Sequence, residues 1–134
     1  MLLTWDFLLN YDNSIPLPET VRTMDTILKY NKWKETIINN GYEINDYLYN
    51  KYLLDKPYCI EENPFRYNVD INIFHYVLWI DNSYKDTLID SQIINIISLK
   101  MIELKCKEYV YFENHISCKS VDKITHYQVF FRKY

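Results

Sequence analysis

The second half of the chain carries the clearest pattern of apolar positions. Residues 74–80 are a short run of aromatic and β-branched side chains, which is typical of a strand. From Asp86 to about Leu104, apolar residues recur every three or four positions, as on the buried face of an α-helix. Two further strands are predicted over residues 108–112 and 125–132, separated by a polar loop.

The first half of the chain is predicted to be helical. Apolar residues recur at roughly helical spacing from Val21 to Ile38, and Gly41 provides the expected C-terminal stop. A second helix is expected over about residues 45–53, where an Asn-Asp pair can cap its first turn. An irregular or extended stretch bracketed by prolines, residues 57–64, then leads to the first strand.

The order of these elements predicts an α+β fold. N-terminal helices are followed by strand, helix, strand and strand, which favours a small antiparallel-rich sheet covered by helices mainly on one face. A length of 134 residues fits a single domain, 1–134, around one core. Within it we expect an N-terminal arm (1–18), a helical part (19–56) and a sheet part (57–134).

Alternation along the two longest strands separates an apolar face of the sheet from a polar one, because successive side chains point to opposite faces. The polar face would carry His75, Val77 and Trp79 from one strand and His126, Gln128 and Phe130 from the other. The opposite face would carry Phe74, Tyr76, Leu78 and Ile80, together with Tyr127, Val129 and Phe131. The apolar face is expected to pack under the helices, and the polar face is expected to be open to a ligand.

Composition narrows the class of protein. Hydrophobic residues make up 49% of the chain and aromatic residues 17%, so a packed core is expected rather than disorder. The net charge of -3 argues against a surface that coats nucleic acid, but it allows a pocket for one nucleotide. The 14 tyrosines, the one glycine and the absence of alanine match A/T-rich codons. We therefore hypothesise an AT-rich genome, such as that of a protist or a large DNA virus.

The sequence gives no indication of export, membrane insertion or metal binding. The cysteines are odd in number and form no CxxC pair. The first residues lack the basic start of a signal peptide, and the apolar-rich run at 71–80 is far below the roughly 18 residues that span a bilayer. We therefore expect a cytoplasmic protein with no membrane partner. His115, Cys118 and His126 stand at a loose zinc-like spacing without a close ligand pair, so no metal or cofactor is predicted.

Five short motifs occur in an order that resembles one protein family. They are Asn63-Pro64-Phe65-Arg66-Tyr67, His75-Tyr76-Val77-Leu78-Trp79, Phe112-Glu113-Asn114, Lys119-Ser120-Val121 and His126-Tyr127-Gln128-Val129-Phe130. Over residues 20–134 this set resembles an uncharacterised family typified by a fungal N-acetylglucosamine-induced protein. Arg66 replaces a proline of the family's pattern, and Gln128 replaces a second histidine. The family has no established reaction, so the resemblance implies a fold and not a mechanism.

The last three motifs are also similar to the second half of histidine-triad nucleotide hydrolases and transferases. In that superfamily a histidine attacks the α-phosphate, and the nucleotidyltransferase branch carries His-x-Gln. The similarity implies that His126 is the nucleophile and that Asn114, Ser120 and Gln128 contact phosphate oxygens. The gap before His126 is longer than in a true triad, and the glycine that usually precedes the serine is absent, so the similarity is an analogy.

These patterns predict one candidate site. The candidate catalytic residue is His126, and the candidate ligand-binding residues are Arg66, Tyr67, His75, Trp79, Asn114, Lys119, Ser120 and Gln128. A neutral imidazole can attack phosphorus, amide and ammonium groups can hold the displaced charge, and an indole can stack on a base or sugar. Each residue also has a purely structural interpretation, such as a hydrogen-bonded histidine, a core tryptophan or an asparagine in a turn.

Three classes of function are consistent with such a site. The first is a nucleotide- or sugar-phosphate-handling domain that acts as a phosphoesterase or nucleotidyl transferase on a small phosphate-bearing ligand. The second is a non-catalytic binder of a nucleotide or of an RNA 5′ end (cap-like), with Trp5, Trp33 and Trp79 as candidates for stacking. The third is an adaptor that binds a protein partner and no small ligand. A shared site requires His75, Trp79 and His126 to lie together.

Overall fold

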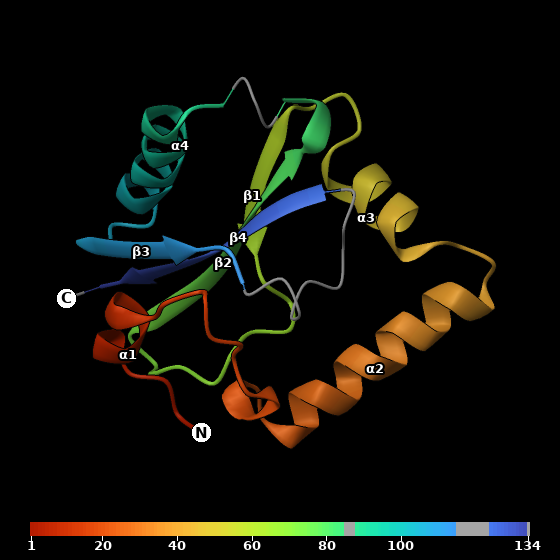
Figure 1. Ribbon diagram of the computed structural model, residues 1–134, viewed down its shortest axis with the longest axis horizontal. Helices are drawn as coiled ribbons and strands as arrows, with labels where there is room; N and C mark the ends of the chain where they lie inside the picture. Colours follow the sequence, from red (N-terminus) through yellow and green to blue (C-terminus); the bar gives the residue numbers. More distant parts are fainter. Residues whose placement is uncertain (85–87, 115–123, 134) are drawn as a thin grey trace.

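The computed structural model describes residues 1–84, 88–114 and 124–133 and has the predicted α+β fold (Figure 1). The elements are α1 (Trp5–Asn10), the 3-10 helix η1 (Glu19–Val21), α2 (Met24–Asn39), α3 (Ile44–Tyr52), β1 (Tyr58–Glu62), β2 (Ile73–Asp81), the 3-10 helix η2 (Asn82–Tyr84), α4 (Asp90–Glu103), β3 (Glu108–Phe112) and β4 (Ile124–Arg132). The strands form a four-stranded antiparallel sheet in the order β1-β2-β4-β3.

The register of the two central strands confirms the predicted faces of the sheet. Trp79 of β2 lies opposite His126 of β4, and Val77 lies opposite Gln128. His75 lies opposite Phe130 in the same ladder. The two strands are nine residues long each and fully paired, so the polar residues of both are held on one face by backbone geometry.

Helix α4 covers the apolar face as predicted. Its buried residues Ile93 and Ile97 pack against Leu78, Val129 and Phe131 of the central strands. The helix begins at Asp90, later than the predicted start at 86, and residues 85–87 lie outside the described part of the chain. The side chain of Gln92 accepts a hydrogen bond from the backbone N–H of Ile89 at 3.1 Å, which satisfies a donor at the start of the helix.

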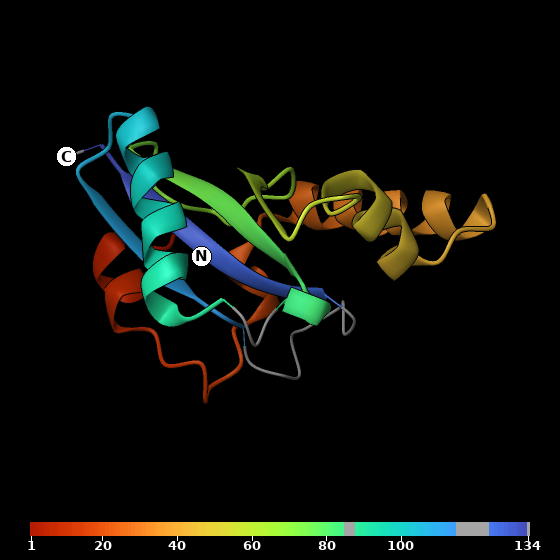
Figure 2. The ribbon, with the colours of Figure 1, turned by 90° about the horizontal axis from the view of Figure 1, so that it is seen from above.

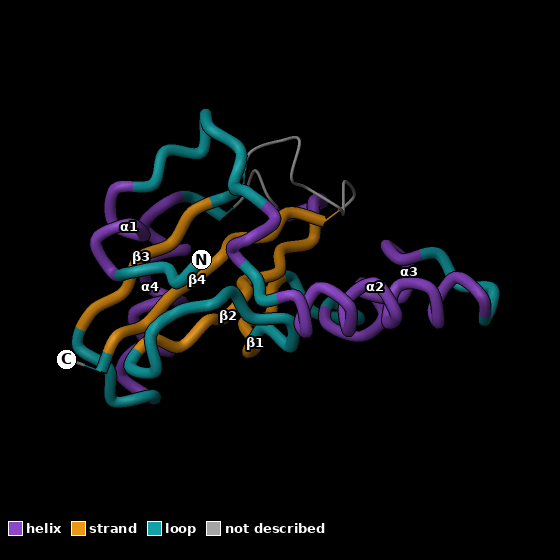
Figure 3. Tube along the Cα trace, turned by 90° about the horizontal axis from the view of Figure 1, so that it is seen from below, coloured by secondary structure: helices purple, strands orange, loops and turns teal. Residues whose placement is uncertain are grey.

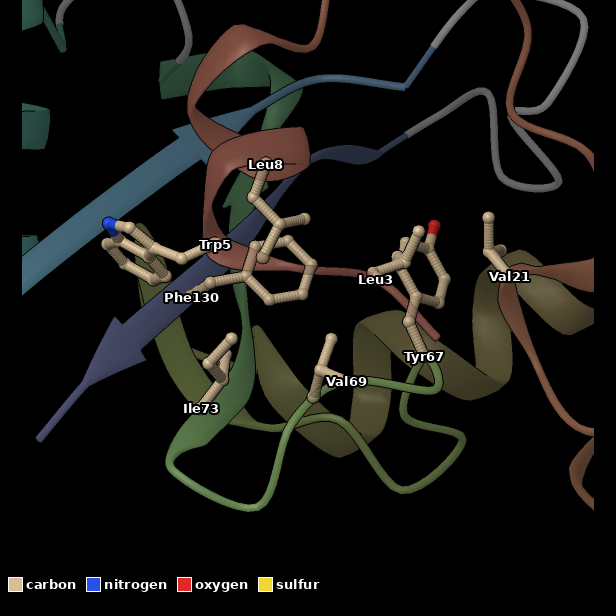
Figure 4. Close-up of a cluster of buried hydrophobic side chains, with 8 residues drawn as sticks. All are labelled: Leu3, Trp5, Leu8, Val21, Tyr67, Val69, Ile73 and Phe130. Atoms are coloured by element: carbon tan, nitrogen blue, oxygen red, sulfur yellow. The ribbon is translucent and has the colours of Figure 1, made fainter. Parts of the chain in front are cut away.

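The polar face is only partly open, because α1 and α3 pack against its two ends (Figure 1). At one end the N-terminal arm forms helix α1, whose Trp5 and Leu8 pack with Leu3 onto Ile73 and Phe130 (Figure 4). Thr4 caps this helix by accepting a hydrogen bond from the Phe7 N–H. The arm was expected only as a leading segment, yet it supplies much of the core on this side.

At the other end of the same face, α3 packs onto the sheet. Its Leu48 and the following Leu53 form a second cluster with Ile124, and Trp79 packs against that cluster. Helices α2 and α3 lie side by side and extend beyond the sheet (Figures 2 and 3). Strand β1 occupies the stretch predicted to be irregular or extended, and it pairs with β2.

Candidate functional site

A cavity of about 230 Å³ lies on the polar face of the sheet, between the cluster under α1 and the cluster under α3. Its floor comes from β2 and β4, and its walls come from α2, α3 and the loop after β1. The lining residues are Arg22, Tyr30, Trp33, Ile44, Leu48, Lys51, Tyr52, Asn63, Pro64, Phe65, Val77, Trp79, His126 and Gln128. Three of the predicted site residues, Trp79, His126 and Gln128, therefore share one cavity.

The floor of the cavity is a row of rings at the centre of the sheet. The rings of Trp79 and His126 are 5.4 Å apart and tilted by 32°, since the two residues are cross-strand partners. Tyr52 of α3 stacks on the Trp79 indole at 5.0 Å with an interplanar angle of 10°. His126 is only 9% exposed, and its side chain lines this cavity.

His75 does not line this cavity but lies behind Gln128. It is 2% exposed, and its Nδ1 accepts a hydrogen bond from the Tyr67 N–H at 3.0 Å. The other nitrogen, Nε2, must then carry the proton, and it donates to Gln128 Oε1 at 2.5 Å. The pKa of His75 is lowered to about 3, mainly by burial; the Gln128 hydrogen bond opposes this shift, and the charges of Arg22 and Arg66 add to it. His75 is therefore neutral and serves as a hydrogen-bonding support.

The wall opposite the sheet is aromatic, and of its residues only Trp33 was predicted as a ligand contact. Trp33 and Tyr30 of α2 lie close to Phe65, with ring centroids 5.3 Å and 5.2 Å from the Phe65 ring. Trp33 also meets Tyr47 of α3 edge-on at 5.9 Å. Trp33 was among the stacking candidates, and it joins Trp79 in the cavity. Trp5 does not, because it is a residue of α1 and packs into the cluster with Ile73 and Phe130.

Arg22 is the principal charged group of the cavity, and sequence reasoning missed it. Its Nε donates to the Phe65 carbonyl at 2.8 Å, and its guanidinium lies over the rings of Tyr67 and Tyr30 at 4.7 and 5.3 Å. The residue is half-buried and makes no ion pair with any carboxylate of the described residues. Lys51, over the ring of Tyr52 at 5.3 Å, adds a second positive charge.

The described lining contains no aspartate or glutamate. Arg22 and Lys51 therefore give the described lining a net positive charge, although the chain as a whole carries a net charge of -3. Partial burial of a guanidinium without an acidic partner is unfavourable. An anion that enters the cavity could form charge-assisted hydrogen bonds with this guanidinium and would offset that cost.

The other predicted site residues lie elsewhere. Arg66 is exposed, and its guanidinium donates a hydrogen bond to the Ile73 carbonyl at 3.5 Å. Tyr67 is buried, and its hydroxyl accepts a hydrogen bond from Asn114 Nδ2 at 3.0 Å. Asn114 is 8% exposed, and its Oδ1 has no hydrogen-bond partner within the described part of the chain. The predicted ligand contacts Lys119 and Ser120 lie outside the described residues.

Residues 1–84, 88–114 and 124–133 contain neither a candidate metal site nor a candidate membrane span. No group of three or more His, Cys, Asp or Glu side chains is placed to hold a metal there. His115 and Cys118, the other members of the zinc-like spacing, lie outside these ranges. No helix in the same ranges is long and apolar enough to cross a bilayer.

The fold and the cavity together define an α+β domain with a positively charged, aromatic-walled site of small-molecule size. No family model matches the chain, and no curated protein matches it. Among solved structures it is similar to the crystal structure of HTC1, with a TM-score of 0.67 and 20% sequence identity. The alignment covers 98% of this chain and 88% of the other. At this identity the likeness shows the fold alone.

Proposed function

We propose that this protein binds a small anionic ligand that carries a ring, such as a nucleotide or a sugar phosphate. The observation that carries the proposal is Arg22, a half-buried guanidinium without an acidic partner among the described residues, at a cavity lined by Trp33, Phe65 and Trp79. A phosphate group would supply the missing anion. The aromatic side chains would hold the base or sugar by stacking, which contributes about 1–3 kcal/mol for each base.

The size and chemistry of the cavity limit the ligand. Its volume of about 230 Å³ is below the range of roughly 300–1,000 Å³ that is usual for drug-sized ligands, which favours a mononucleotide or a hexose phosphate over a dinucleotide. The absence of a carboxylate from the described lining also matters. Guanine presents N–H donors along its edge, and an acidic side chain would accept hydrogen bonds from them. The base is therefore expected to be held by stacking rather than read by its edge.

A binding screen tests this proposal. Nucleoside monophosphates, nucleotide sugars, hexose phosphates and cap analogues would be ranked by thermal shift, and the best would be measured by calorimetry. We expect a phosphate-bearing ligand to bind, and Arg22→Met to weaken it by about tenfold or more, the cost of one lost charge-assisted hydrogen bond. The matched control is Arg66→Met, which removes the same charge outside the cavity and should change affinity by less than about twofold.

Failure to find any phosphate-bearing ligand with folded protein would contradict the proposal. So would equal binding by the wild type and Arg22→Met. The melting temperature of each variant without ligand shows whether the substitution has simply unfolded the protein. Capture of a partner protein together with a negative ligand screen would favour an adaptor instead.

Catalysis by His126 is the second candidate function, because its imidazole lines the same cavity as Arg22. The imidazole would act as nucleophile or general acid/base in a phosphoesterase or nucleotidyl transferase reaction. We expect His126→Asn to reduce turnover of a bound phosphoester by about 100-fold or more while its Kd changes little. Turnover would be followed by release of phosphate or nucleoside. Binding without any turnover by the wild type would exclude this candidate and leave the binder.

The RNA 5′-end alternative rests on Trp33 and Trp79, which line one cavity and could stack on the terminal base. Inclusion of cap analogues in the screen compares it directly with free nucleotides.

A further inference from the structure

A buried chain of hydrogen bonds fixes the orientation of the Gln128 side chain. The Tyr67 N–H donates to His75 Nδ1 at 3.0 Å, and His75 Nε2 donates to Gln128 Oε1 at 2.5 Å. All three residues are at least nine-tenths buried, and the imidazole is also stacked on Phe130 at 4.3 Å. The hydrogen bond from Tyr67 requires a bare Nδ1 and therefore a protonated Nε2 on His75. This tautomer in turn requires His75 to be the donor in its bond with Gln128.

This row of hydrogen bonds turns the amide oxygen of Gln128 towards His75 and leaves its NH₂ group as the end that can face the cavity. The amide oxygen is used by His75, and no other hydrogen bond of the side chain is present in the described residues. Gln128 also lines the cavity, so its NH₂ group is the polar group it offers to a ligand. An amide that could turn freely would offer either an acceptor or a donor, and this one offers a donor.

Asn63 is oriented in the same way. Its Oδ1 accepts a hydrogen bond from the Phe65 N–H at 2.8 Å. Its Nδ2 lies 3.4 Å from His75 Nε2, and because both nitrogens carry hydrogen in this tautomer, no hydrogen bond joins them. Asn63 also lines the cavity. Arg22 and Lys51 are donors by their chemistry. Gln128, Arg22 and Lys51 therefore share one property, since each offers hydrogen-bond donors to the cavity.

We infer that Gln128 is a specificity-determining residue that selects ligand oxygens which accept hydrogen bonds, and that His75 is the positioning residue that holds its amide in this orientation. The inference rests on the proposed function and narrows it. The preferred ligand group is an oxyanion, as in a phosphate monoester, and a group that donates hydrogen bonds is rejected. A ligand group that donates N–H or O–H would meet the NH₂ group of Gln128 instead of an acceptor. Both donors would then lack a hydrogen-bond partner, which lowers the affinity.

The test compares a ligand that bears the oxyanion with one that lacks it. Adenosine 5′-monophosphate and adenosine would be titrated into the wild type, Gln128→Glu and His75→Asn. Gln128→Glu keeps the shape of the side chain but replaces its donors by a negative acceptor. We expect it to reduce the ratio of the two affinities by about 100-fold. The control is Gln92→Glu, the same change at an exposed position on α4, which should leave the ratio within about twofold.

His75→Asn tests the positioning role. Asparagine can still accept from the Tyr67 N–H but does not reach Gln128, so the amide loses its fixed orientation. We expect the affinity ratio to fall by about tenfold. A second, ligand-free measurement accompanies it. Nitrogen-15 NMR of the imidazole should show a protonated Nε2 and a bare Nδ1 in the wild type, and the Gln128 side-chain amide signals should be sharp there and broadened in His75→Asn.

The outcomes separate the inference from the proposed function. If the wild type binds neither adenosine 5′-monophosphate nor any other phosphate ester, both are overturned. If it binds the monophosphate but Gln128→Glu and His75→Asn keep the wild-type ratio, the inference alone is overturned. The opposite tautomer of His75 overturns it as well. A reduced ratio together with the Nε2–H tautomer supports it.

Discussion

Acidification from about pH 7 to about pH 5 is expected to lower the free energy of unfolding by about 2 kcal/mol through His75 alone. In the folded protein this imidazole is fully enclosed and neutral, with a pKa lowered to about 3 from an ordinary value of 6.5. Desolvation is the main cause. In the unfolded chain the same group takes up a proton near its ordinary pKa, so acid favours unfolding.

The sign and the window follow from the two pKa values. Below 6.5 the unfolded state binds a proton that the folded state does not, so stability falls as the pH falls. The loss continues until the folded state also protonates, near pH 3. The contribution of His75 to the free energy of unfolding is therefore fully present above pH 6.5. Its complete loss, near pH 3, amounts to roughly 4–5 kcal/mol. That is a large part of the 5–15 kcal/mol, roughly, that stabilises a typical domain.

Urea denaturation of the wild type and His75→Asn at both pH values measures this effect. The variant lacks the titrating group but retains His126 and every carboxylate, so subtracting its pH dependence isolates His75. We expect the wild type to lose about 2 kcal/mol more than the variant between the two pH values. Equal losses in both proteins would show that His75 is not held neutral by burial. An NMR titration of the His75 ring would then be expected to show an ordinary pKa.

Strand alternation explains why part of the site could be predicted. Trp79, His126 and Gln128 fall on one face because the side chains of a strand alternate, and this rule needs only local sequence. The pairing of the two central strands, which places Trp79 opposite His126, was consistent with that rule but was fixed by the fold. The same alternation placed His75 on this face, yet the loop that carries Tyr67 encloses it.

The rest of the site could not be predicted because it depends on how the helices dock. Arg22 and Trp33 come from the start and middle of the N-terminal helical part, and Phe65 comes from a loop. Nothing in their local sequence indicates that they meet over β2 and β4. Helix α1 was missed for a related reason. At six residues it is too short to show a helical period, and its Trp5 and Leu8 become core residues only through contact with the sheet.

Phe130→Ala is expected to lower the free energy of unfolding by about 3–5 kcal/mol, the range for removing a large ring from a close-packed core. Phe130 is 0% exposed and lies in the central strand β4. Its ring stacks on His75 at 4.3 Å and on Phe112 at 5.7 Å, and it packs with Trp5 and Leu8 of α1 (Figure 4). The cavity left by alanine would therefore lie between the sheet and the N-terminal arm.

The matched control is Phe7→Ala, which removes the same ring from a position that is 37% exposed on α1 and should cost less than about 1 kcal/mol. Urea denaturation measures both variants, and similar losses in the two would contradict the assigned core. Hydrogen exchange adds a second test, since loss of the contact should release the amide of Leu3, which donates to the Asn68 carbonyl at 2.7 Å. Because the Phe130 ring also supports the imidazole that orients Gln128, the variant should weaken phosphate-ester binding as well. A core contact would then control the ligand site through His75.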